Sequence, residues 1–504
     1  MAKVIIVGGG VAGLSAGIFS QLSGFETEIL ESHTKAGGNL TGWDREGYHI
    51  DNCIHWLTGT NPVTDLCKMW ETLGALKEVE VYQPKTLYTY SAEGHTLSLS
   101  RDIETLRRDM LSFSKDDERE IERFIGAVKA AMTLSGISPD DTCKKATQKE
   151  LIRWTPRLIR YYPMSAGELS RRFHSRVIRG FLASLLGEEF GAVALLFVFS
   201  TFCSLNGGIP SGASCAMAER MVQRFESLGG VLRCSSMVKE IETENGRAKS
   251  VLLQNGRRVP ADYVILACEP AAAFGRLLSV RLMPKRLLAR YRDESLRRFS
   301  SFHCAFSCDR EHLPFEGDLI VDLPRDLQEE FDSAYLILRE FSHEESFSPK
   351  GKSLLQTICF CPAQVSRRFI GLRGNKEAYR AYKNRLSDRI REVICEQFPI
   401  LSGTLSCIDC WTPATYSRYT HSPTGSYMSF AFPKARLPRY ISGRVKGVEN
   451  LFLATQWQQA PGGLPSAAFA GQMAARELLR QAKRVRVLRP MWERDSSKTP
   501  AIEN

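Results

Sequence analysis

The sequence of 504 residues lacks a hydrophobic run long enough to cross a membrane. The nearest candidate, Ala192 to Cys203, is shorter than the ~18 uninterrupted apolar residues that a spanning helix needs. Ser200 and Thr201 also interrupt it. Residues 1–3 lead directly into an apolar strand-like segment, which leaves no room for a signal peptide. Both absences favour a cytoplasmic location.

The sequence also lacks the paired Cys and His motifs that are typical of zinc sites. Its fourteen cysteines are scattered, and Cys407-x-x-Cys410 is its only C-x-x-C motif. No second pair or histidine partner stands nearby, and the motif precedes an expected strand rather than opening a helix. We therefore expect no metal site and no thioredoxin-like role, but two unrelated free thiols in a reducing compartment.

Basic residues are unevenly distributed along the chain. The formal net charge is +11, and residues 151–182 hold seven arginines against one acid, Glu168, with five aromatic residues among them. This composition favours contact with an anionic membrane surface. It is equally typical of a solvated helical face whose aromatic residues lie in the core. Nucleic-acid binding is not expected, because no nucleic-acid-binding fold accompanies the segment.

What the sequence does contain is a strand–turn–helix–strand unit at its start. The apolar, β-branched run Lys3 to Val7 predicts a buried parallel strand. It leads into Gly8-x-Gly10-x-x-Gly13, and a helix rich in small residues follows and stops at Gly24. A second strand then ends on the acid Glu31. This order predicts a Rossmann-like α/β fold.

Each position in the unit has a physical reason. Gly8 permits the tight turn, Gly10 lets the backbone approach a pyrophosphate, and Gly13 lets helix and strand pack closely. The helix amino terminus, with Ala12 in its first turn, offers free N–H groups to phosphates. Glu31 lies 18 residues after Gly13, where an acid accepts hydrogen bonds from the adenosine ribose. The unit therefore predicts a dinucleotide site.

Two later loops resemble this geometry. Residues 36–43 contain Gly37-Gly38, which would let the backbone close over the other side of the cofactor. Near the carboxyl end, the strand Asn450 to Ala454 runs into a glycine loop at 460–465 and then a helix from Ser466. A glycine loop at a helix amino terminus is again typical of an anion or cofactor contact.

The sequence offers fewer candidates for reactive side chains than for cofactor contacts. His55 follows an apolar segment, and either faces a reaction centre or is a core histidine bonded to a backbone carbonyl. Residues 411–420 are rich in groups that can line a pocket. Between these, we expect strands in 76–100, helices over most of 112–204, a loop at 206–212, strands at 301–307, 335–338 and 353–361, and a helix that Asn375 caps and that runs to Gln397.

Taken in order, these residues resemble the flavin-dependent phytoene desaturase-like oxidoreductases, which include carotenoid isomerases and retinol saturases. The wider group has the amine oxidase and Rab-GDP-dissociation-inhibitor architecture. The resemblance covers nearly the whole chain, and the motifs that carry it are Gly8 to Gly13 with Glu31, Gly37-Gly38, Gly207 to Pro210, Val238 with Ile241, Ala261-Asp262-x-Val264, Gln456-Trp457 and Pro461-Gly462-Gly463.

The resemblance implies a discontinuous, glutathione-reductase-like FAD domain of residues 1–75, 205–275 and 440–482. It also implies a sheet-plus-helix substrate domain of residues 76–111 and 276–439. Residues 112–204 would form a helical lid, and residues 483–504 a disordered basic tail. The implied FAD contacts are Gly8, Gly10, Ala12, Gly13, Glu31, Gly38, Asn39, Val238, Thr455, Gln456, Gly463, Leu464 and Pro465.

Three residues depart from the family pattern. Thr455 and Ser466 replace glycines, and Asn39 stands where many relatives have arginine. A bulkier residue where the backbone approaches the cofactor would weaken FAD binding.

The implied activity is FAD-dependent desaturation, saturation or isomerisation of a long apolar unsaturated lipid, such as an isoprenoid, a carotenoid-like polyene or a fatty acyl chain. We expect a hydrophobic small-molecule substrate, and peripheral contact with an anionic membrane. Two alternatives stay open: a flavin amine oxidase, and a non-catalytic lipid or prenyl binder. Candidates to line the flavin face are His55, Tyr416, Arg418, Tyr419 and Trp457.

Overall fold

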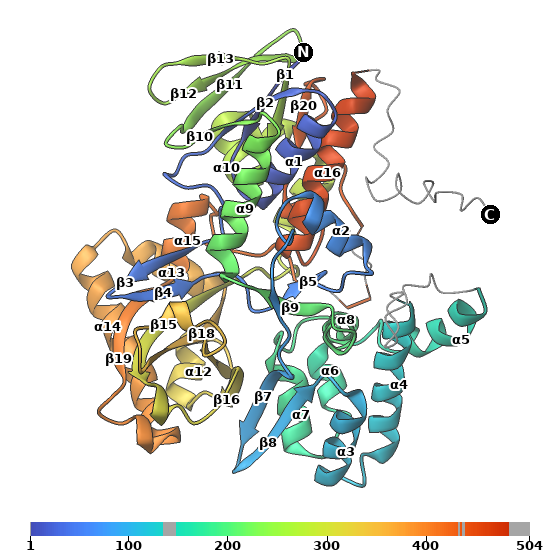
Figure 1. The fold of residues 1–504 in the computed structure, drawn as a ribbon, viewed down its shortest axis with the longest axis vertical. Coiled ribbons are helices and arrows are strands. Elements are labelled where there is room, and N and C mark those ends of the chain that lie inside the picture. The colour runs from blue at the N-terminus through green and yellow to red at the C-terminus, as the bar shows by residue number, and fades with distance from the viewer. Residues whose placement is uncertain (1, 135–147, 432–433, 436–438, 483–504) are drawn as a thin grey trace, which may run out of the picture.

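The computed structural model describes residues 2–134, 148–431, 434–435 and 439–482, and the side chains of Leu134, Gln148 and residues 150–154 lie outside that description. The predicted basic tail at 483–504 also lies outside it. The chain forms a five-stranded sheet and a larger, seven-stranded sheet. In Figure 1 the first sheet lies with its helices at the top, the larger sheet lies below, and a group of helices lies at the lower right.

The upper sheet is parallel and joins segments from both ends of the chain. The neighbouring pairs run in register, with Ile5 of the first strand beside Glu28 on one side and Val264 on the other. The strand order is β10 (Val231–Arg233), β2 (Glu26–Leu30), β1 (Lys3–Val7), β14 (Tyr263–Leu266) and β20 (Leu451–Leu453).

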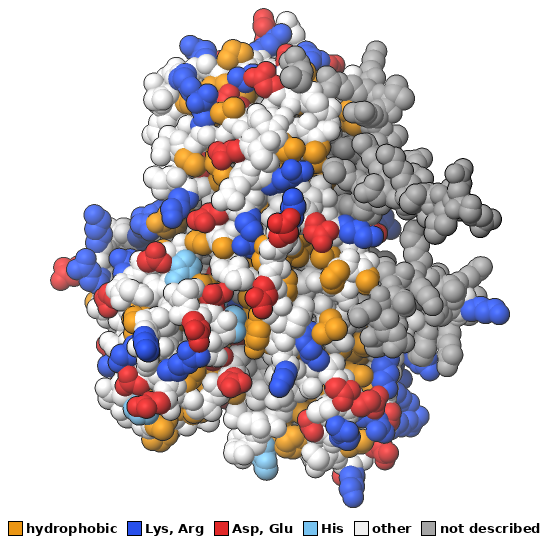
Figure 2. All heavy atoms as spheres, in the orientation of Figure 1, with side chains coloured by type: hydrophobic (Ala, Val, Ile, Leu, Met, Phe, Trp, Pro, Cys, Tyr) orange, Lys and Arg blue, Asp and Glu red, His pale blue; other side chains and the backbone are white. Residues whose placement is uncertain are grey.

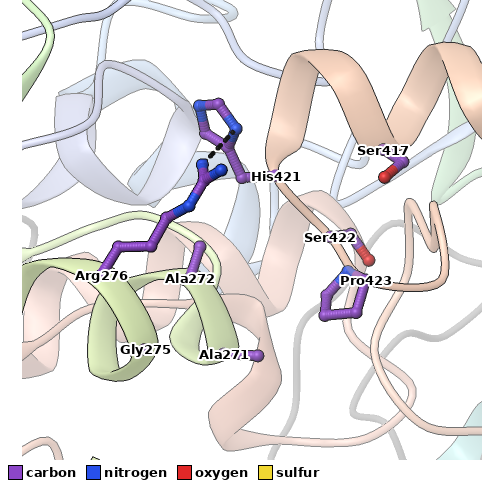
Figure 3. Close-up of a pocket in the computed structure, with 8 residues that line it drawn as sticks. All are labelled: Ala271, Ala272, Gly275, Arg276, Ser417, His421, Ser422 and Pro423. Atoms are coloured by element: carbon purple, nitrogen blue, oxygen red, sulfur yellow. Dashed lines mark hydrogen bonds between the residues drawn. The ribbon is translucent and has the colours of Figure 1, made fainter. Parts of the chain in front are cut away.

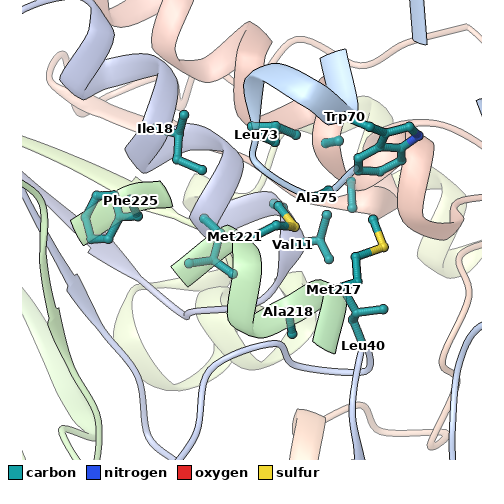
Figure 4. Packing of buried hydrophobic residues seen from close by; sticks show 14 of the residues in the cluster. Val11, Ile18, Leu40, Trp70, Leu73, Ala75, Met217, Ala218, Met221 and Phe225 are labelled. Carbon is teal, nitrogen blue, oxygen red and sulfur yellow. The ribbon is translucent and has the colours of Figure 1, made fainter. Parts of the chain in front are cut away.

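Both faces of this sheet are buried, as β-branched strands require. Helices pack on one face, and a small antiparallel sheet of residues 238–260, with Phe274 and Leu287, packs on the other. The first helix, α1 (Val11–Leu22), packs against α16 (Gly463–Gln481) and α9 (Ala213–Ser227). Figure 4 shows the core between α1, α9 and α2 (Asp65–Thr72). Its labelled side chains include Val11, Ile18, Leu40, Trp70, Leu73, Ala75, Met217, Ala218, Met221 and Phe225.

The larger sheet has seven strands and again joins distant segments. Its order is β19 (Ser406–Trp411), β15 (Phe299–Asp309), β18 (Lys352–Pro362), β17 (Tyr335–Glu340), β16 (Asp318–Asp322), β7 (Thr86–Ala92) and β8 (His95–Ser100). Four helices complete this part, namely α12 (Arg325–Phe331), α13 (Ala363–Leu372), α14 (Lys376–Gln397) and α15 (Pro413–Thr420).

The helical group packs on β7 and β8 through a separate apolar cluster. Its members are α3 (Ile103–Phe113), α4 (Glu118–Leu134), α5 (Gln148–Ile159), α6 (Ala166–Ser170), α7 (Arg176–Ser184) and α8 (Ala192–Cys203). The apolar run noted in the sequence is α8, whose side chains are almost all buried within the protein. Within the described residues, no helix is both long and apolar enough to span a bilayer.

Small sheets connect these parts. They are β3 (Gly42–Arg45) with β4 (Tyr48–Asp51), β11 (Val238–Glu244) with β12 (Arg247–Leu253) and β13 (Arg258–Pro260), and β9 (Gly207–Pro210) between β5 (Leu57–Thr58) and β6 (Val81–Tyr82). The loop predicted at 206–212 is therefore wrong in part, because Gly207–Pro210 forms a strand. Its partners are remote in sequence, and only the tertiary fold supplies them.

Candidate active site

The first glycine motif forms a cradle in which side chains would collide. A Cβ atom on Gly13 would lie 2.0 Å from the carbonyl oxygen of Gly8, so only glycine lets α1 start this close to β1. Gly8 has φ +105°, and a Cβ there would lie 3.0 Å from the carbonyl oxygen of Ala267. Both positions fit the turn predicted from sequence.

Gly10 differs, because it borders open space. A Cβ at Gly10 would have its nearest neighbour, the Cα of Gly38, 3.8 Å away. The N–H of Gly37 donates to the carbonyl oxygen of Gly9 at 2.8 Å, which holds the second glycine loop beside the first. Gly38 has φ +62°. The two loops therefore face each other at the amino terminus of α1, where Ala12 lies in the first turn.

Glu31 is buried at the end of β2 and holds the cradle together. Its Oε2 accepts a hydrogen bond from the Gly9 N–H at 2.7 Å, and its Oε1 accepts from the His33 N–H at 2.8 Å. Oε1 also accepts from the Ser32 hydroxyl at 3.1 Å, so the further lone pair is on Oε2. Glu31 can thus accept a ribose hydroxyl while it keeps these backbone contacts.

The amino terminus of α16 approaches the same region from the other side of α1. Gly471 packs against α1 so closely that a Cβ would lie 2.5 Å from the Ala12 carbonyl oxygen. The helix begins at Gly463, with half-buried Leu464 and Pro465 in its first turn. Its free N–H groups add a second positive dipole end.

Thr455, one of the departures from the family pattern, has a structural explanation. Its N–H donates to Gln458 Oε1 at 2.8 Å, and its hydroxyl accepts from the Trp457 N–H at 3.5 Å, so it caps the short 3₁₀ helix Gln456–Gln458. The side chain is turned to this cap and is buried. Ser466 is half-buried in α16.

Two predicted cofactor residues meet at one carbonyl oxygen. Asn39 Nδ2 and Gln456 Nε2 donate to the backbone oxygen of Tyr427, at 3.3 and 2.9 Å. Gln456 Oε1 also accepts from the Gly463 N–H at 2.8 Å. The loops from the two ends of the upper sheet therefore converge on Tyr427, whereas Val238, the first residue of β11, is buried among the apolar side chains beside β14.

A buried polar network lies directly behind Tyr427. The ring centroids of Tyr427 and Tyr416 are 5.2 Å apart. The Tyr416 hydroxyl donates to Asn52 Oδ1 at 2.9 Å, accepts from Trp411 Nε1 at 3.0 Å, and lies 3.1 Å from His303 Nε2. His303 also pairs with the Ser301 hydroxyl and stacks on Trp411 at 4.6 Å.

This network is neutral at ordinary pH. Burial, with a contribution from nearby His55, lowers the pKa of His303 to about 3. Burial raises the pKa of Tyr416 well above its ordinary value, and it also raises the pKa of Tyr427. The aromatic pair is thus backed by neutral donors and acceptors rather than by charge.

His55 lies close to this network but belongs to another cluster. Its Nδ1 is 3.6 Å from Asp318 Oδ2, and its backbone oxygen accepts from the Arg339 guanidinium at 2.7 Å. Arg339 and Asp318 form a buried ion pair at 3.3 Å. Burial and then the Arg339 charge lower the pKa of His55, which is therefore neutral at pH 7.

The other predicted reactive residues do not join the network. Trp457 is buried in the core, where it stacks on Tyr291 at 5.2 Å and meets Phe430 edge-on. Arg418 is exposed and stacks over the Tyr419 ring. Tyr419 is 50% exposed and lies against His33, near the ribose end of the cradle. Of the five candidates, only Tyr416 and His55 reach this region.

A pocket lies beside the ribose end of the cradle (Figure 3). Arg276 and His421 are in contact at this pocket, with a guanidinium nitrogen 3.2 Å from Nδ1 (Figure 3). Burial, Arg276 and His33 lower the pKa of His421, whereas Glu31 raises it. The lining comes from the helix after β14 and from the end of α15, and comprises Ala271, Ala272, Gly275, Arg276, Ser417, His421, Ser422 and Pro423.

The basic segment at 151–182 is largely neutralised where the structure describes its side chains. Glu120 pairs with Arg160 and Arg172, Arg171 pairs with Glu188, and Arg176 pairs with Glu93 and Asp322. On the face in Figure 2, Lys and Arg side chains over the helical group lie among Asp and Glu side chains.

These residues fit a flavin adenine dinucleotide. Glycines line the turn between β1 and α1, Gly10 borders open space at the amino terminus of α1, and the buried carboxylate of Glu31 lies beside this turn. The family described as "Flavin containing amine oxidoreductase" matches residues 11–479.

Individual proteins of known activity are also similar in sequence over nearly the whole chain. The lycopene-forming phytoene desaturase of Pseudescherichia vulneris is 23% identical, over 94% of this chain and 98% of that protein. The chloroplastic prolycopene isomerase of Arabidopsis thaliana is also 23% identical, over 94% of this chain and 81% of that protein.

A solved oxidoreductase structure from Methanosarcina mazei has the same fold, with a TM-score of 0.58 and 16% identity over 95% of this chain and 100% of that chain. The predicted α/β fold class and FAD cofactor are therefore confirmed. The chain belongs to the flavin-containing amine oxidoreductase family, and within it resembles the carotenoid desaturases and isomerases.

Proposed function

We propose that this FAD-dependent oxidoreductase acts on a long, apolar, unsaturated lipid such as a carotenoid-like polyene, another isoprenoid or a fatty acyl chain. The observation that carries the proposal is the neutral, buried network behind the Tyr416–Tyr427 pair. A charged site would favour a charged substrate, because an unpaired buried charge is costly. The carotenoid desaturases and isomerases among the relatives support the same class.

The wall beside this network is apolar. Trp56, next to His55, and Phe360 of β18 are half-buried and pack on the cluster that joins the helical group to the sheet. We propose that the lipid chain lies along this wall, between residues 112–204 as the lid and residues 76–111 and 276–439 as the substrate domain.

We assign the cofactor contacts as the sequence predicts them. Gly8, Gly10, Ala12 and Gly13 would hold the pyrophosphate, Glu31 the ribose, and the Val238 backbone the adenine. Gly38, Asn39, Thr455, Gln456 and the first turn of α16 would hold the remainder. Thr455 caps the short 3₁₀ helix, so its side chain is no obstacle, and one of the two residues that favour a non-catalytic lipid binder, Thr455 and Ser466, is explained.

The chemistry that a bound flavin supplies is two-electron exchange with a substrate carbon. The protein excludes water and orients the substrate carbon toward that site. The Tyr416 hydroxyl can hold a proton between Asn52 and His303, because His303 is neutral and has a ring nitrogen in reach. Desaturation, saturation and isomerisation would use the same groups.

A second candidate, amine oxidation, is favoured by one observation. Tyr416 and Tyr427 form an aromatic pair, with centroids 5.2 Å apart, where the cofactor loops converge. An ammonium group can lie over the face of such a ring. This pair replaces the predicted combination of Tyr416 with Trp457, which lies in the core.

The test is an anaerobic screen with flavin absorbance as the readout. Polyenes, prenyl lipids and unsaturated fatty acyl lipids are mixed in detergent with the oxidised and the reduced holoprotein, and amines are assayed separately in air for peroxide. Bleaching or reoxidation by one lipid class, or its isomerisation by the reduced protein, supports the proposal. Peroxide release with amines alone would replace it by the second candidate.

We also propose peripheral contact between the helical group and an anionic membrane, from the cytoplasmic side. Support comes from Ile159 and Phe197, which are 60% and 54% exposed, and from the excess of arginine over acidic residues in 151–182. Co-sedimentation with phosphatidylserine vesicles, but not with phosphatidylcholine vesicles, is expected for the full chain. A variant with Ile159→Ser and Phe197→Ser should stay in the supernatant. Equal sedimentation of both proteins would contradict the proposal.

A further inference from the structure

The edge strand of the seven-stranded sheet contains a bulge that changes where its cysteines point. In β19, Cys410 pairs with Cys304 and Asp409 with Ala305, but Cys407 pairs with Phe306, so Ile408 is the extra residue. In a regular strand, residues three apart face opposite sides. One extra residue brings Cys407 and Cys410 to the same side.

Three sulfur atoms meet there. The Sγ atoms of Cys304 and Cys410 are 3.1 Å apart, and those of Cys407 and Cys410 are 4.0 Å apart. Cys304 is fully buried in β15, Cys410 is half-buried, and Cys407 is exposed. The cluster therefore extends from the surface into the sheet. Cys407 and Cys410, which the sequence predicted to be unrelated thiols, are neighbours.

Polar groups of α14 activate the exposed member. The Ser387 hydroxyl donates to Cys407 Sγ at 3.1 Å, and Lys383 Nζ donates to the Cys410 carbonyl oxygen beside it. Hydrogen bonds from Cys304, Cys410 and Ser387, with the Lys383 charge, lower the pKa of the Cys407 thiol. The thiolate is the reactive form of cysteine.

We propose that Cys407, Cys410 and Cys304 form a redox-active thiol site whose substrate is a hydroperoxide. The Cys407 thiolate attacks the peroxide oxygen, the O–O bond breaks, and Cys407 becomes a sulfenic acid, while the other oxygen takes a proton from solvent and leaves as water or an alcohol. The Cys410 thiol then attacks the Cys407 sulfur, the S–O bond breaks, and water leaves as the disulfide forms.

The buried thiol can take part in a further exchange. Cys304 attacks the Cys410 sulfur, a Cys304–Cys410 disulfide forms, and Cys407 leaves as a thiol again. A low-molecular-weight dithiol supplies the two electrons and two protons that restore the reduced site. This chemistry does not use the flavin, so a negative result here would not contradict the proposed lipid substrate, and a negative lipid screen would not contradict the thiol site.

The experiment treats the purified holoprotein with hydrogen peroxide, blocks free thiols with N-ethylmaleimide, and maps peptides without reduction. Cys395 is the internal reference, because it lies in the same helix α14 and is half-buried away from the other thiols. We expect a disulfide from Cys410 to Cys407 or Cys304, while Cys395 stays reduced and dithiothreitol reverses the bond. Oxidation of Cys395 as readily as Cys407 would overturn the proposal.

Two variants separate the steps. In the double variant with Cys304→Ser and Cys410→Ser, Cys407 should form a sulfenic acid that dimedone traps, without a disulfide in the cluster. In Ser387→Ala, alkylation of Cys407 at pH 6.5 should slow severalfold. In the unchanged protein, Cys407 should react at least about tenfold faster than Cys395, because the thiolate is the reactive form and the pKa of Cys407 is lowered. Equal alkylation rates for the two thiols would contradict the assignment.

Discussion

At the scale of single residues, the cradle depends on glycines whose neighbours leave no space. Gly13→Ala should lower FAD affinity about a hundredfold, or ~3 kcal/mol, since its Cβ would lie 2.0 Å from the Gly8 carbonyl oxygen. The measurement is the ratio of flavin to protein absorbance across an FAD titration. Gly126→Ala, in α4 with no atom within 4 Å of the added Cβ, is the matched control. Full flavin content in Gly13→Ala would contradict the cradle.

Tyr416 links the network at the convergence of the cofactor loops. Tyr416→Phe leaves Asn52 Oδ1 and Trp411 Nε1 without this partner, at a cost of ~1–3 kcal/mol. We expect flavin reduction by substrate to slow at least about tenfold, with FAD content unchanged. Tyr419→Phe, outside the network, should react at the normal rate in the same stopped-flow assay. Equal rates for both variants would remove Tyr416 from the site.

Glu269 should make the free energy of unfolding depend on pH, and the direction of the change follows from its raised pKa. Burial raises the pKa of Glu269 from its ordinary 4.5 to about 7, while the Tyr291 hydroxyl donates to its Oε1 at 2.5 Å. The folded state then holds more protons than the unfolded state between these values. The free energy of unfolding should therefore fall by about 3 kcal/mol as the pH rises from 4.5 to 7, and this contribution should stay constant above pH 7.

Glu269→Gln tests that dependence, because an amide keeps hydrogen-bonding capacity but does not ionise in this range. Urea unfolding at pH 5, 6, 7 and 8 should show that the difference in unfolding free energy, variant minus unchanged protein, increases toward pH 7. A parallel pair of curves would show that Glu269 is not the group responsible.

The sequence predicted the local geometry of the first glycine turn better than the polar network around Tyr416, for a physical reason. Gly8, Gly13 and Glu31 act through a local βαβ unit, which spacing alone specifies. Asn52, His303 and Tyr427 were missed because strands and loops far apart in the chain bring them together. His303 could have been singled out from the sequence, because it is a histidine within a largely apolar strand, a setting similar to that of His55.

At the scale of elements, the long helices and buried strands were the most predictable. Asn375 caps α14 as expected, with its Oδ1 accepting from the Ala378 N–H at 3.1 Å, and the helix ends at Gln397. The bulge in β19 was not predictable, because it depends on the register with β15. The strand β9 was missed because its glycines have low strand propensity and its partners, β5 and β6, are distant in the sequence.

The packing of α16 against α1 fixes the position of one helix relative to the other, and with it the positions of their amino termini. Gly471→Ala should push them apart, because the added Cβ would lie 2.5 Å from the Ala12 carbonyl oxygen. We expect a loss of ~1–3 kcal/mol in unfolding free energy, with weaker FAD binding. Thermal denaturation with and without added FAD measures both. Gly371→Ala, in α13 with open space around it, should leave both values unchanged.

At the scale of the whole molecule, both large sheets join segments that are distant in sequence. The upper sheet takes strands from residues 3–30, 231–266 and 451–453, and the larger sheet joins residues 86–100 to residues 299–411. This arrangement places the cofactor loops of one sheet against the network carried by the other. The flavin site therefore exists only when the segments assemble, and FAD should stabilise the whole fold.

The measurement that tests the central claim most directly is an absorption spectrum of the purified protein, before and after denaturation. The intact cradle predicts flavin bands in the folded protein and release of about one FAD per chain on unfolding, as expected for a single site. A colourless protein that also fails to take up added FAD would contradict both the cradle and the oxidoreductase function built on it.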